Sequence, residues 1–150
     1  MAELAEQKRE EYRAHAPVFH RPKDGAREVH EPYLAALVED GDNVTLVHEA
    51  ADGHVDAFLV AMLFPAPPVY DPGGSTCSVD DFVVESPELW ETAGRALLER
   101  AFAATRQRGA VQSVVVCGPQ DEPKRTLLRS MGHDVASEWF TLPFGQPAVT

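Results

Sequence analysis

Apolar residues recur every three to four positions in several stretches of the chain, which is the spacing of amphipathic helices. The pattern predicts a charged helix at 3–14 and a second helix at 26–38. The longest helix is expected at 88–108, where apolar residues follow the i, i+4, i+7, i+8 pattern of a helix packed on a sheet. A shorter helix is expected at 122–131.

Stretches rich in β-branched and aromatic residues predict five strands, at 44–50, 55–64, 76–85, 111–117 and 133–142. Asp52-Gly53 is a hairpin signal between the first two. The near-continuous apolar run of the second indicates burial on both faces. The third and fourth flank the longest helix, so we expect a βαβ unit with parallel strands and a right-handed crossover.

The length of 150 residues indicates one domain, 1–150, with an N-terminal helical segment at 1–15 and a frayed tail at 145–150. The order of elements predicts an α/β fold with a mixed sheet and flanking helices. The longest apolar run is shorter than the roughly 18 residues that a membrane span needs, so no membrane partner is expected. The two cysteines, with no leader-like N-terminus, favour reduced thiols and a cytoplasmic protein.

The formal net charge of -11 argues against nucleic acid as a partner, because phosphate binding requires basic surfaces. The charge is unevenly distributed: residues 1–90 are strongly acidic, whereas residues 91–129 carry a net positive charge. The acidic part suits a cationic ligand and the basic part suits a polyanion. Two solvated surfaces of uneven composition explain the same pattern.

Residues 81–98 are expected to form a buried strand, a short turn and the start of the longest helix. A helix N-terminus at the end of a strand offers free backbone N–H groups and the positive end of the helix dipole to an anion. Ser86 is placed to cap this helix and Pro87 to occupy its first turn.

The order of elements over residues 12–143 resembles the GNAT family of N-acetyltransferases. Family members often carry Asp-Leu-x-Val-x-Pro before Arg/Gln-x-x-Gly-x-Gly/Ala, and Asp81-Phe82-Val83-Val84 resembles the first motif. Residues 89–98 resemble the second motif and the helix after it, and 127–133 resembles a Leu-Tyr-x-x-x-Gly-Phe motif. The resemblance implies a GNAT-like fold whose sheet splays between the family's fourth and fifth strands, here 76–85 and 111–117.

The resemblance also implies a cofactor, acetyl-CoA. Its pantetheine arm would pair with the backbone of Phe82, Val83 and Val84. Its pyrophosphate would meet backbone N–H groups of the turn and helix start, namely Leu89, Trp90, Glu91, Thr92, Ala93, Gly94 and Arg95. Asp121 stands where many members have an Asn that faces the cofactor.

Besides Asp121, further positions depart from the family pattern: Leu89 replaces Arg/Gln, Thr92 replaces the first Gly, and Leu128 replaces a Tyr that protonates the departing thiolate. His133 likewise replaces the usual Phe.

Amine acetylation requires a base, and the family uses a carboxylate on its fourth strand. The strand period of two places Asp80 and Asp81 on opposite faces, and the motif spacing favours Asp81 as the base. An acidic pair at the sheet edge or facing solvent is the more common explanation for two such residues. Tyr33, Tyr70 and His133 are candidate proton donors that the sequence does not rank.

Other chemical signals are weaker. Cys117 is expected to be an inert buried thiol, since no His is placed by sequence to activate it. The six His residues lack metal-ligand spacing, so no metal is expected. Trp90 either covers the turn as a lid or packs on the sheet.

The sequence therefore favours an acetyl-CoA-dependent N-acetyltransferase that acts by direct attack of a primary amine, on a small molecule or an amine-bearing side chain. The alternative is a weakly active or inactive GNAT-fold binding or regulatory module, which the departures at Leu89, Thr92 and Leu128 favour. Dimers are common in the family. Trp139 and Phe140 are therefore candidates for a homodimer interface, although core positions are the simpler expectation.

Overall fold

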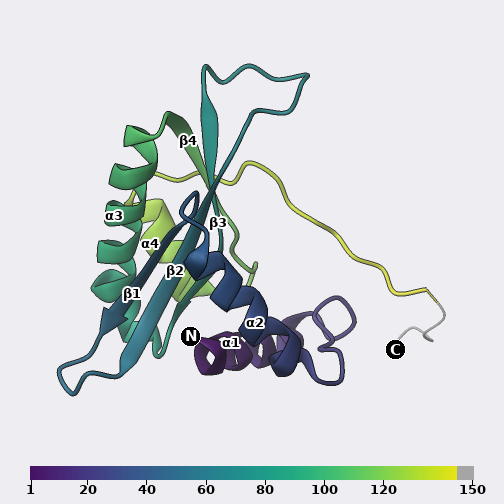
Figure 1. Ribbon diagram of the computed structural model, residues 1–150. Coiled ribbons are helices and arrows are strands. Elements are labelled where there is room, and N and C mark those ends of the chain that lie inside the picture. The colour runs from purple at the N-terminus through teal and green to yellow at the C-terminus, as the bar shows by residue number, and fades with distance from the viewer. Residues whose placement is uncertain (145–150) are drawn as a thin grey trace.

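The fold was obtained as a computed structural model that describes residues 1–144 (Figure 1); the tail expected at 145–150 lies outside the described residues. The elements are α1 (Ala2–His15), α2 (Ala26–Glu39), β1 (Val44–Glu49), β2 (Val55–Phe64), β3 (Ser75–Val84), the 3₁₀ helix η1 (Pro87–Glu91), α3 (Ala93–Gln107), β4 (Ala110–Val115) and α4 (Glu122–Ser130). The two N-terminal helices, four of the five strands and the last helix are confirmed within two residues at either end.

The four strands form one mixed sheet in the order β1-β2-β3-β4. β1, β2 and β3 are antiparallel neighbours, and β4 pairs parallel to β3 after the crossover through α3. Figure 1 shows α3 and α4 on one face of the sheet and α1 and α2 on the other. This arrangement confirms the predicted α/β fold class.

The sheet separates two hydrophobic cores. The core beneath α3 and α4 includes Leu59, Phe82, Leu98 and Leu127. The core beneath α1 and α2 includes Leu4, Leu34, Phe58, Val60 and Val83. Alternate residues of β2 serve the two cores, so its central residues are buried on both faces, as predicted.

β3 contains a β-bulge at residues 80–81. The pairing with β2 passes from Val79 opposite Ala61 to Phe82 opposite Leu59, so two residues of β3 lie across from one residue of β2. A bulge interrupts the alternation of side chains and commonly redirects them near functional sites. The strand period therefore does not decide which way the two aspartates point.

β3 and β4 separate beyond the bulge. The last backbone hydrogen bond between them is donated by the Val116 N–H to the Val79 carbonyl, at 2.9 Å. β3 continues to Val84, whereas the segment that follows β4 turns at Gly118 toward α4. The splay expected from the family resemblance is thus part of this fold.

The single helix predicted at 88–108 is two helices. η1 is a short 3₁₀ turn, and α3 begins only at Ala93. Ser86 forms no side-chain cap bond to η1, so its predicted capping role is wrong. The helix ends as expected, because Gly109 takes a φ of 94°, which a residue with a Cβ rarely adopts.

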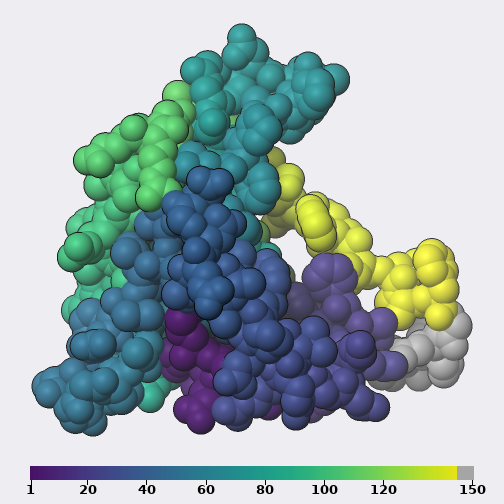
Figure 2. All heavy atoms as spheres, in the orientation of Figure 1, coloured from purple at the N-terminus to yellow at the C-terminus, as the bar shows by residue number. Residues whose placement is uncertain are grey.

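The strand predicted at 133–142 is also wrong within the described part of the chain. Residues 134–144 have no helical or strand structure and are exposed throughout. Trp139 is 82% and Phe140 is 92% exposed, so neither is a core position. Figure 2 shows this segment standing clear of the body over part of its length.

Candidate functional site

Lys124 lies in the splay between β3 and β4. It is in the first turn of α4, and its side chain is buried. The ammonium donates a hydrogen bond to the Phe82 carbonyl of β3 at 3.3 Å. It also lies 5.1 Å from the ring centre of Phe82 and 5.5 Å from that of Trp90. Burial lowers the pKa of Lys124 to about 8. A backbone carbonyl expected to hold the pantetheine arm is therefore bonded to a side chain of the protein.

Asp121 anchors α1 to the end of the splay. Its carboxylate accepts hydrogen bonds from the Tyr12 hydroxyl at 2.9 Å and from the Lys124 backbone N–H at 3.4 Å, and it pairs with the Lys8 ammonium at 2.6 Å. The Tyr12 hydroxyl in turn accepts the Gly118 N–H at 3.0 Å. The Asp121 carboxylate thus caps α4 and also fixes α1 across the point where β4 ends.

The start of α3 retains part of the predicted anion cradle. The Thr92 N–H is bonded to the Leu89 carbonyl, and the first α-helical bond runs from the Ala96 N–H to the Thr92 carbonyl. Within the described chain, the N–H groups of residues 93–95 have no backbone acceptor, as at any helix start. These three amides lack an acceptor, although Ala93 and Gly94 are buried, whereas the Thr92 N–H is already used.

The side chains around this helix start are engaged with the protein itself. Trp90 is buried and packs edge-on against Phe82, with ring centres 4.9 Å apart, so it packs on the sheet. The Arg95 guanidinium donates to Glu91 at 2.6 Å and to the Ser130 hydroxyl at 2.8 Å. An anion would compete with both contacts for Arg95.

Gly94 is enclosed by side chains. A Cβ at this position would lie 3.0 Å from a ring carbon of Trp90 and 3.5 Å from a methyl carbon of Leu127. The contact to Trp90 is tighter than ordinary van der Waals contact. Packing of α3 on η1 and α4 thus explains a glycine here without a phosphate.

Substitution of Gly94 by Val is expected to lower the free energy of unfolding by about 1–3 kcal/mol, since the branched side chain overpacks against Trp90. Urea unfolding followed by circular dichroism measures the change. Gly41→Val is the matched control, because a Cβ at Gly41 meets no atom within 4 Å. Unchanged stability of Gly94→Val would contradict the packing role and leave the cradle as the reason for the glycine.

Asp81 belongs to a second polar group on the α1 and α2 side. Its carboxylate lies 3.7 Å from Nε2 of His30, and the His30 ring stacks on Tyr33 with centres 5.9 Å apart. The Arg9 guanidinium lies within hydrogen-bond distance of Nδ1 of His30. Burial raises the pKa of Asp81, and the neighbouring His30 opposes part of this rise. A half-buried carboxylate of raised pKa is suited to accept a proton.

The structure brings together only some of the predicted site residues. Tyr33 and Asp81 both lie beside His30. Phe82 and Val84 pack in the core beneath α3, whereas Val83 packs beneath α1 and α2. The role of each of these residues in binding or catalysis stays a prediction.

Sequence reasoning missed the residues that close the splay, chiefly Lys124, Lys8 and Tyr12. One signal was present for Lys124: it lies three and four residues before Leu127 and Leu128, on the buried stripe of α4. No comparable signal marks Lys8 or Tyr12, because their partners lie more than 100 residues away along the chain.

The described conformation does not fit acetyl-CoA in the predicted position. The Phe82 carbonyl is bonded to Lys124, the Gly118 amide to Tyr12 and the Thr92 amide to Leu89. A pantetheine arm would have to displace a buried ammonium and the polar contacts of α1. Of the predicted phosphate contacts at 89–95, the N–H groups of residues 93–95 lack a backbone acceptor in the described chain.

Metal-binding and membrane-spanning features are absent from the described part of the chain. Residues 1–144 contain no group of three or more His, Cys, Asp or Glu that could hold a metal ion. Over the same residues, no helix has the length and apolarity needed to cross a membrane. Cys77 and Cys117 are free thiols, and burial raises the pKa of each, in keeping with an inert role for Cys117.

The architecture is that of the GNAT acetyltransferases, as the comparison with solved structures shows. No protein-family model matches the sequence, and no curated protein matches it significantly. A tetramutant of the BH1408 protein from Bacillus halodurans superposes with a TM-score of 0.78 at 17% identity, over 95% of this chain and 90% of that one.

Two further solved structures that resemble this chain carry acetyltransferase names. A putative acetyl transferase from Pyrococcus furiosus has a TM-score of 0.64 at 18% identity, over 94% of each chain. Glucosamine-6-phosphate N-acetyltransferase from Arabidopsis thaliana has a TM-score of 0.58 at 16% identity, over 81% of this chain and 79% of that one. At these identities the likeness establishes the fold.

Proposed function

We propose that this chain is a GNAT-fold binding or regulatory module that does not transfer acetyl groups from CoA. The observation that carries this proposal is the buried Lys124 ammonium bonded to the Phe82 carbonyl in the splay. The Phe82 carbonyl and the space between β3 and β4, which a cofactor would use, are occupied by the Lys124 side chain of α4. The acidic residues 1–90 make a cationic partner the chemical class that such a module would bind.

The physical basis is competition for the same space. Cofactor entry would require Lys124 to leave the Phe82 carbonyl and α1 to release Asp121. A ligand can shift a conformational equilibrium only by its differential affinity for the two states, so this rearrangement weakens cofactor binding directly.

Thermal unfolding in the presence of acetyl-CoA tests the proposal. A ligand at about 100 times its dissociation constant adds roughly 2.7 kcal/mol of stability. We expect no shift of the melting temperature with millimolar acetyl-CoA, and none with adenosine as the control. A shift with acetyl-CoA alone would overturn the proposal. If Lys124→Ala gains such a shift, the Lys124 side chain is identified as the obstruction.

The second candidate is an N-acetyltransferase that transfers acetyl from acetyl-CoA to a primary amine. The half-buried Asp81 of raised pKa at the bulge of β3 favours it, as do the free amides of residues 93–95. This reading applies if the protein binds acetyl-CoA. Asp81→Asn should then slow the release of free thiol without weakening cofactor binding, and unchanged turnover would exclude Asp81 as the base.

A further inference from the structure

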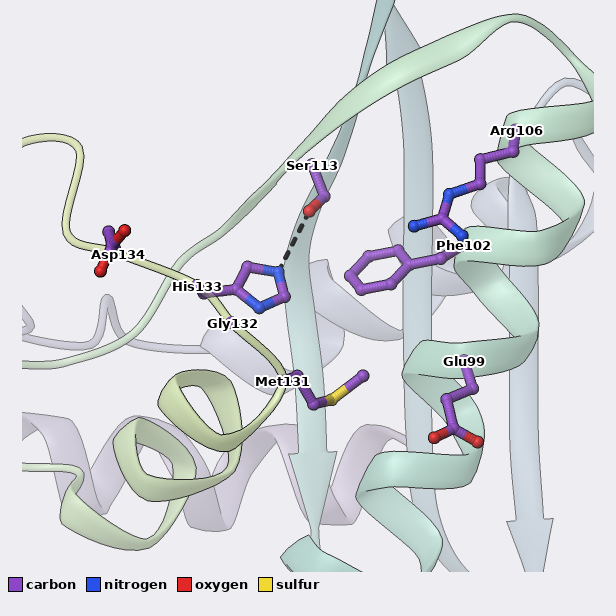
Figure 3. A pocket seen from close by; sticks show the side chains of 8 residues that line it. All are labelled: Glu99, Phe102, Arg106, Ser113, Met131, Gly132, His133 and Asp134. Atoms are coloured by element: carbon purple, nitrogen blue, oxygen red, sulfur yellow. Dashed lines mark hydrogen bonds between the residues drawn. The ribbon is translucent and has the colours of Figure 1, made fainter.

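A serine and a histidine lie in hydrogen-bond contact in a hollow beside β4, away from the splay. The Ser113 hydroxyl of β4 lies 3.1 Å from Nε2 of His133, which follows the turn that ends α4 (Figure 3). Both side chains are half-buried and line a hollow of about 550 Å³ between α3 and this turn. Small-molecule sites commonly have such a volume, so the pair is within reach of a ligand from solvent.

The Leu128 carbonyl fixes which ring nitrogen of His133 carries the proton. Nδ1 of His133 lies 3.2 Å from this carbonyl oxygen, which can only accept a hydrogen bond, so Nδ1 is the protonated nitrogen. In the neutral ring Nε2 is then an acceptor, and the Ser113 hydroxyl donates to it. The same carbonyl accepts the His133 backbone N–H at 3.0 Å, and the Phe102 ring lies against the imidazole with centres 5.6 Å apart. The orientation of the imidazole is therefore held by the protein.

This arrangement is that of an activated nucleophile. A hydroxyl within hydrogen-bond reach of a base, with the base oriented by a third group, is the pattern by which serine nucleophiles work. Here the third group is the Leu128 carbonyl in place of a carboxylate. A carbonyl holds the tautomer but has no full charge to stabilise an imidazolium, so we expect slow turnover.

The edge of β4 supplies a donor for the charge that develops on a reacting carbonyl. The Val116 N–H donates to the Val79 carbonyl of β3. Because N–H groups of a strand alternate in direction, the amides of Ser113 and Val115 face away from β3. β4 is the last strand of the sheet within residues 1–144, so no further strand accepts these amides. The Ser113 amide is thus a donor beside the attacking hydroxyl, as an oxyanion site requires.

The walls of the hollow favour an uncharged ligand. Phe102 and Met131 provide apolar surface beside the pair (Figure 3). The exposed Arg106 is accompanied by two exposed carboxylates, those of Glu99 and Asp134, so the hollow has no excess of positive charge for an anion. A small neutral ester matches both features.

We propose that Ser113 and His133 form a nucleophile–base pair that hydrolyses small uncharged carboxylic esters. The Ser113 oxygen bonds to the ester carbonyl carbon while its proton passes to Nε2 of His133. The C–O bond to the alcohol then breaks, the alcohol leaves with that proton, and the acyl group stays on Ser113. Water attacks the acyl-serine with His133 again taking the proton, the acid leaves, and the proton returns to the Ser113 oxygen. The net reaction is ester plus water to acid plus alcohol, and it is independent of cofactor binding in the splay.

Covalent labelling of the full chain by an alkyl fluorophosphonate tests the proposal. A reactive serine displaces fluoride from phosphorus, and peptide mass spectrometry locates the adduct. We expect an adduct on Ser113 and none on the exposed Ser137, which is the matched control. The His133→Gln variant should label at least about 100-fold more slowly, the lower end of the range for a general base. Hydrolysis of p-nitrophenyl acetate should fall by a similar factor in this variant and in Ser113→Ala.

The exposed His15 provides the control for the histidine, because His15→Gln changes a surface imidazole outside the hollow and should label and hydrolyse as the wild type does. Circular dichroism checks that each variant is folded. A wild-type chain without an adduct on Ser113 would overturn the proposal, whatever the variants do. Labelling at an equal rate in the wild type and a folded His133→Gln variant would exclude His133 as the base. In either case the bond between the two side chains serves only to hold residue 133 against β4.

Discussion

Asp121→Ala is expected to lower the free energy of unfolding by about 3–5 kcal/mol, the usual loss when one partner of a buried ion pair is removed. The substitution leaves the Lys8 ammonium and the Tyr12 hydroxyl without their acceptor and removes the cap of α4. Urea unfolding measures the loss. Hydrogen exchange should also show faster exchange in α1, because Asp121 holds that helix against the end of β4.

Two neighbouring variants serve as controls for this prediction. Glu122→Ala should cost less than about 1 kcal/mol, since the Glu122 side chain is 64% exposed and pairs with Arg129 at the surface. Asp121→Asn retains an acceptor for Tyr12 but loses the charge that pairs with Lys8, so its loss should be intermediate. Equal stability of Asp121→Ala and Glu122→Ala would show that α1 is held by its apolar contacts alone.

Lys124→Met is expected to raise the free energy of unfolding at pH 7 by about 1–4 kcal/mol, as often follows when buried charges are replaced by apolar residues of similar volume. The ammonium is buried, and burial lowers its pKa from 10.5 to about 8. At pH 7 the folded protein must therefore hold a desolvated charge, which Met removes.

The advantage of Met should depend on pH with a defined sign. Between about pH 8 and 10.5 the unfolded chain binds more protons at Lys124 than the folded chain does, so the wild type gains stability as pH rises through this range. The advantage of Met should accordingly shrink there and stay constant below pH 8. The Lys124 charge also lowers the pKa of Cys117, which burial raises, so the two unfolding curves are compared in a Cys117→Ala background.

The exposed Lys23 provides the control, because Lys23→Met should change stability little at any pH. A Lys124→Met protein that is less stable at pH 7 would indicate that the bond to the Phe82 carbonyl outweighs desolvation. That outcome would make the contact between α4 and β3 a polar anchor of the fold.

The likeness to acetyltransferase structures concerns the fold of the molecule, whereas the closure of the splay by Lys124 concerns its candidate site. The fold follows from the sheet order and the helices on its two faces, which Lys124 does not alter. Function resides in sites rather than in the fold. The tests of cofactor binding and of Lys124 therefore decide between the proposed module and the transferase. Neither outcome changes the assignment of the fold.

The sequence by itself determined most elements, because their signals are local. Asp52-Gly53 marked the hairpin, and the apolar run of 55–64 marked a strand buried on both faces. The spacing of Ala93, Leu97 and Ala101 marked the buried side of α3. Each signal lies within a few residues of the element that it predicts, so neither a sheet nor a partner helix had to be known.

Only the tertiary structure decided the state of the site and the last segment. Lys124 is buried because the Phe82 carbonyl, 42 residues earlier, and the Trp90 ring lie beside it. The bulge at 80–81 arises from pairing with β2, which composition does not reveal. Residues 133–142 have strand composition but no strand in the described chain, because a strand requires hydrogen-bond partners from a neighbouring edge and no local pattern supplies them.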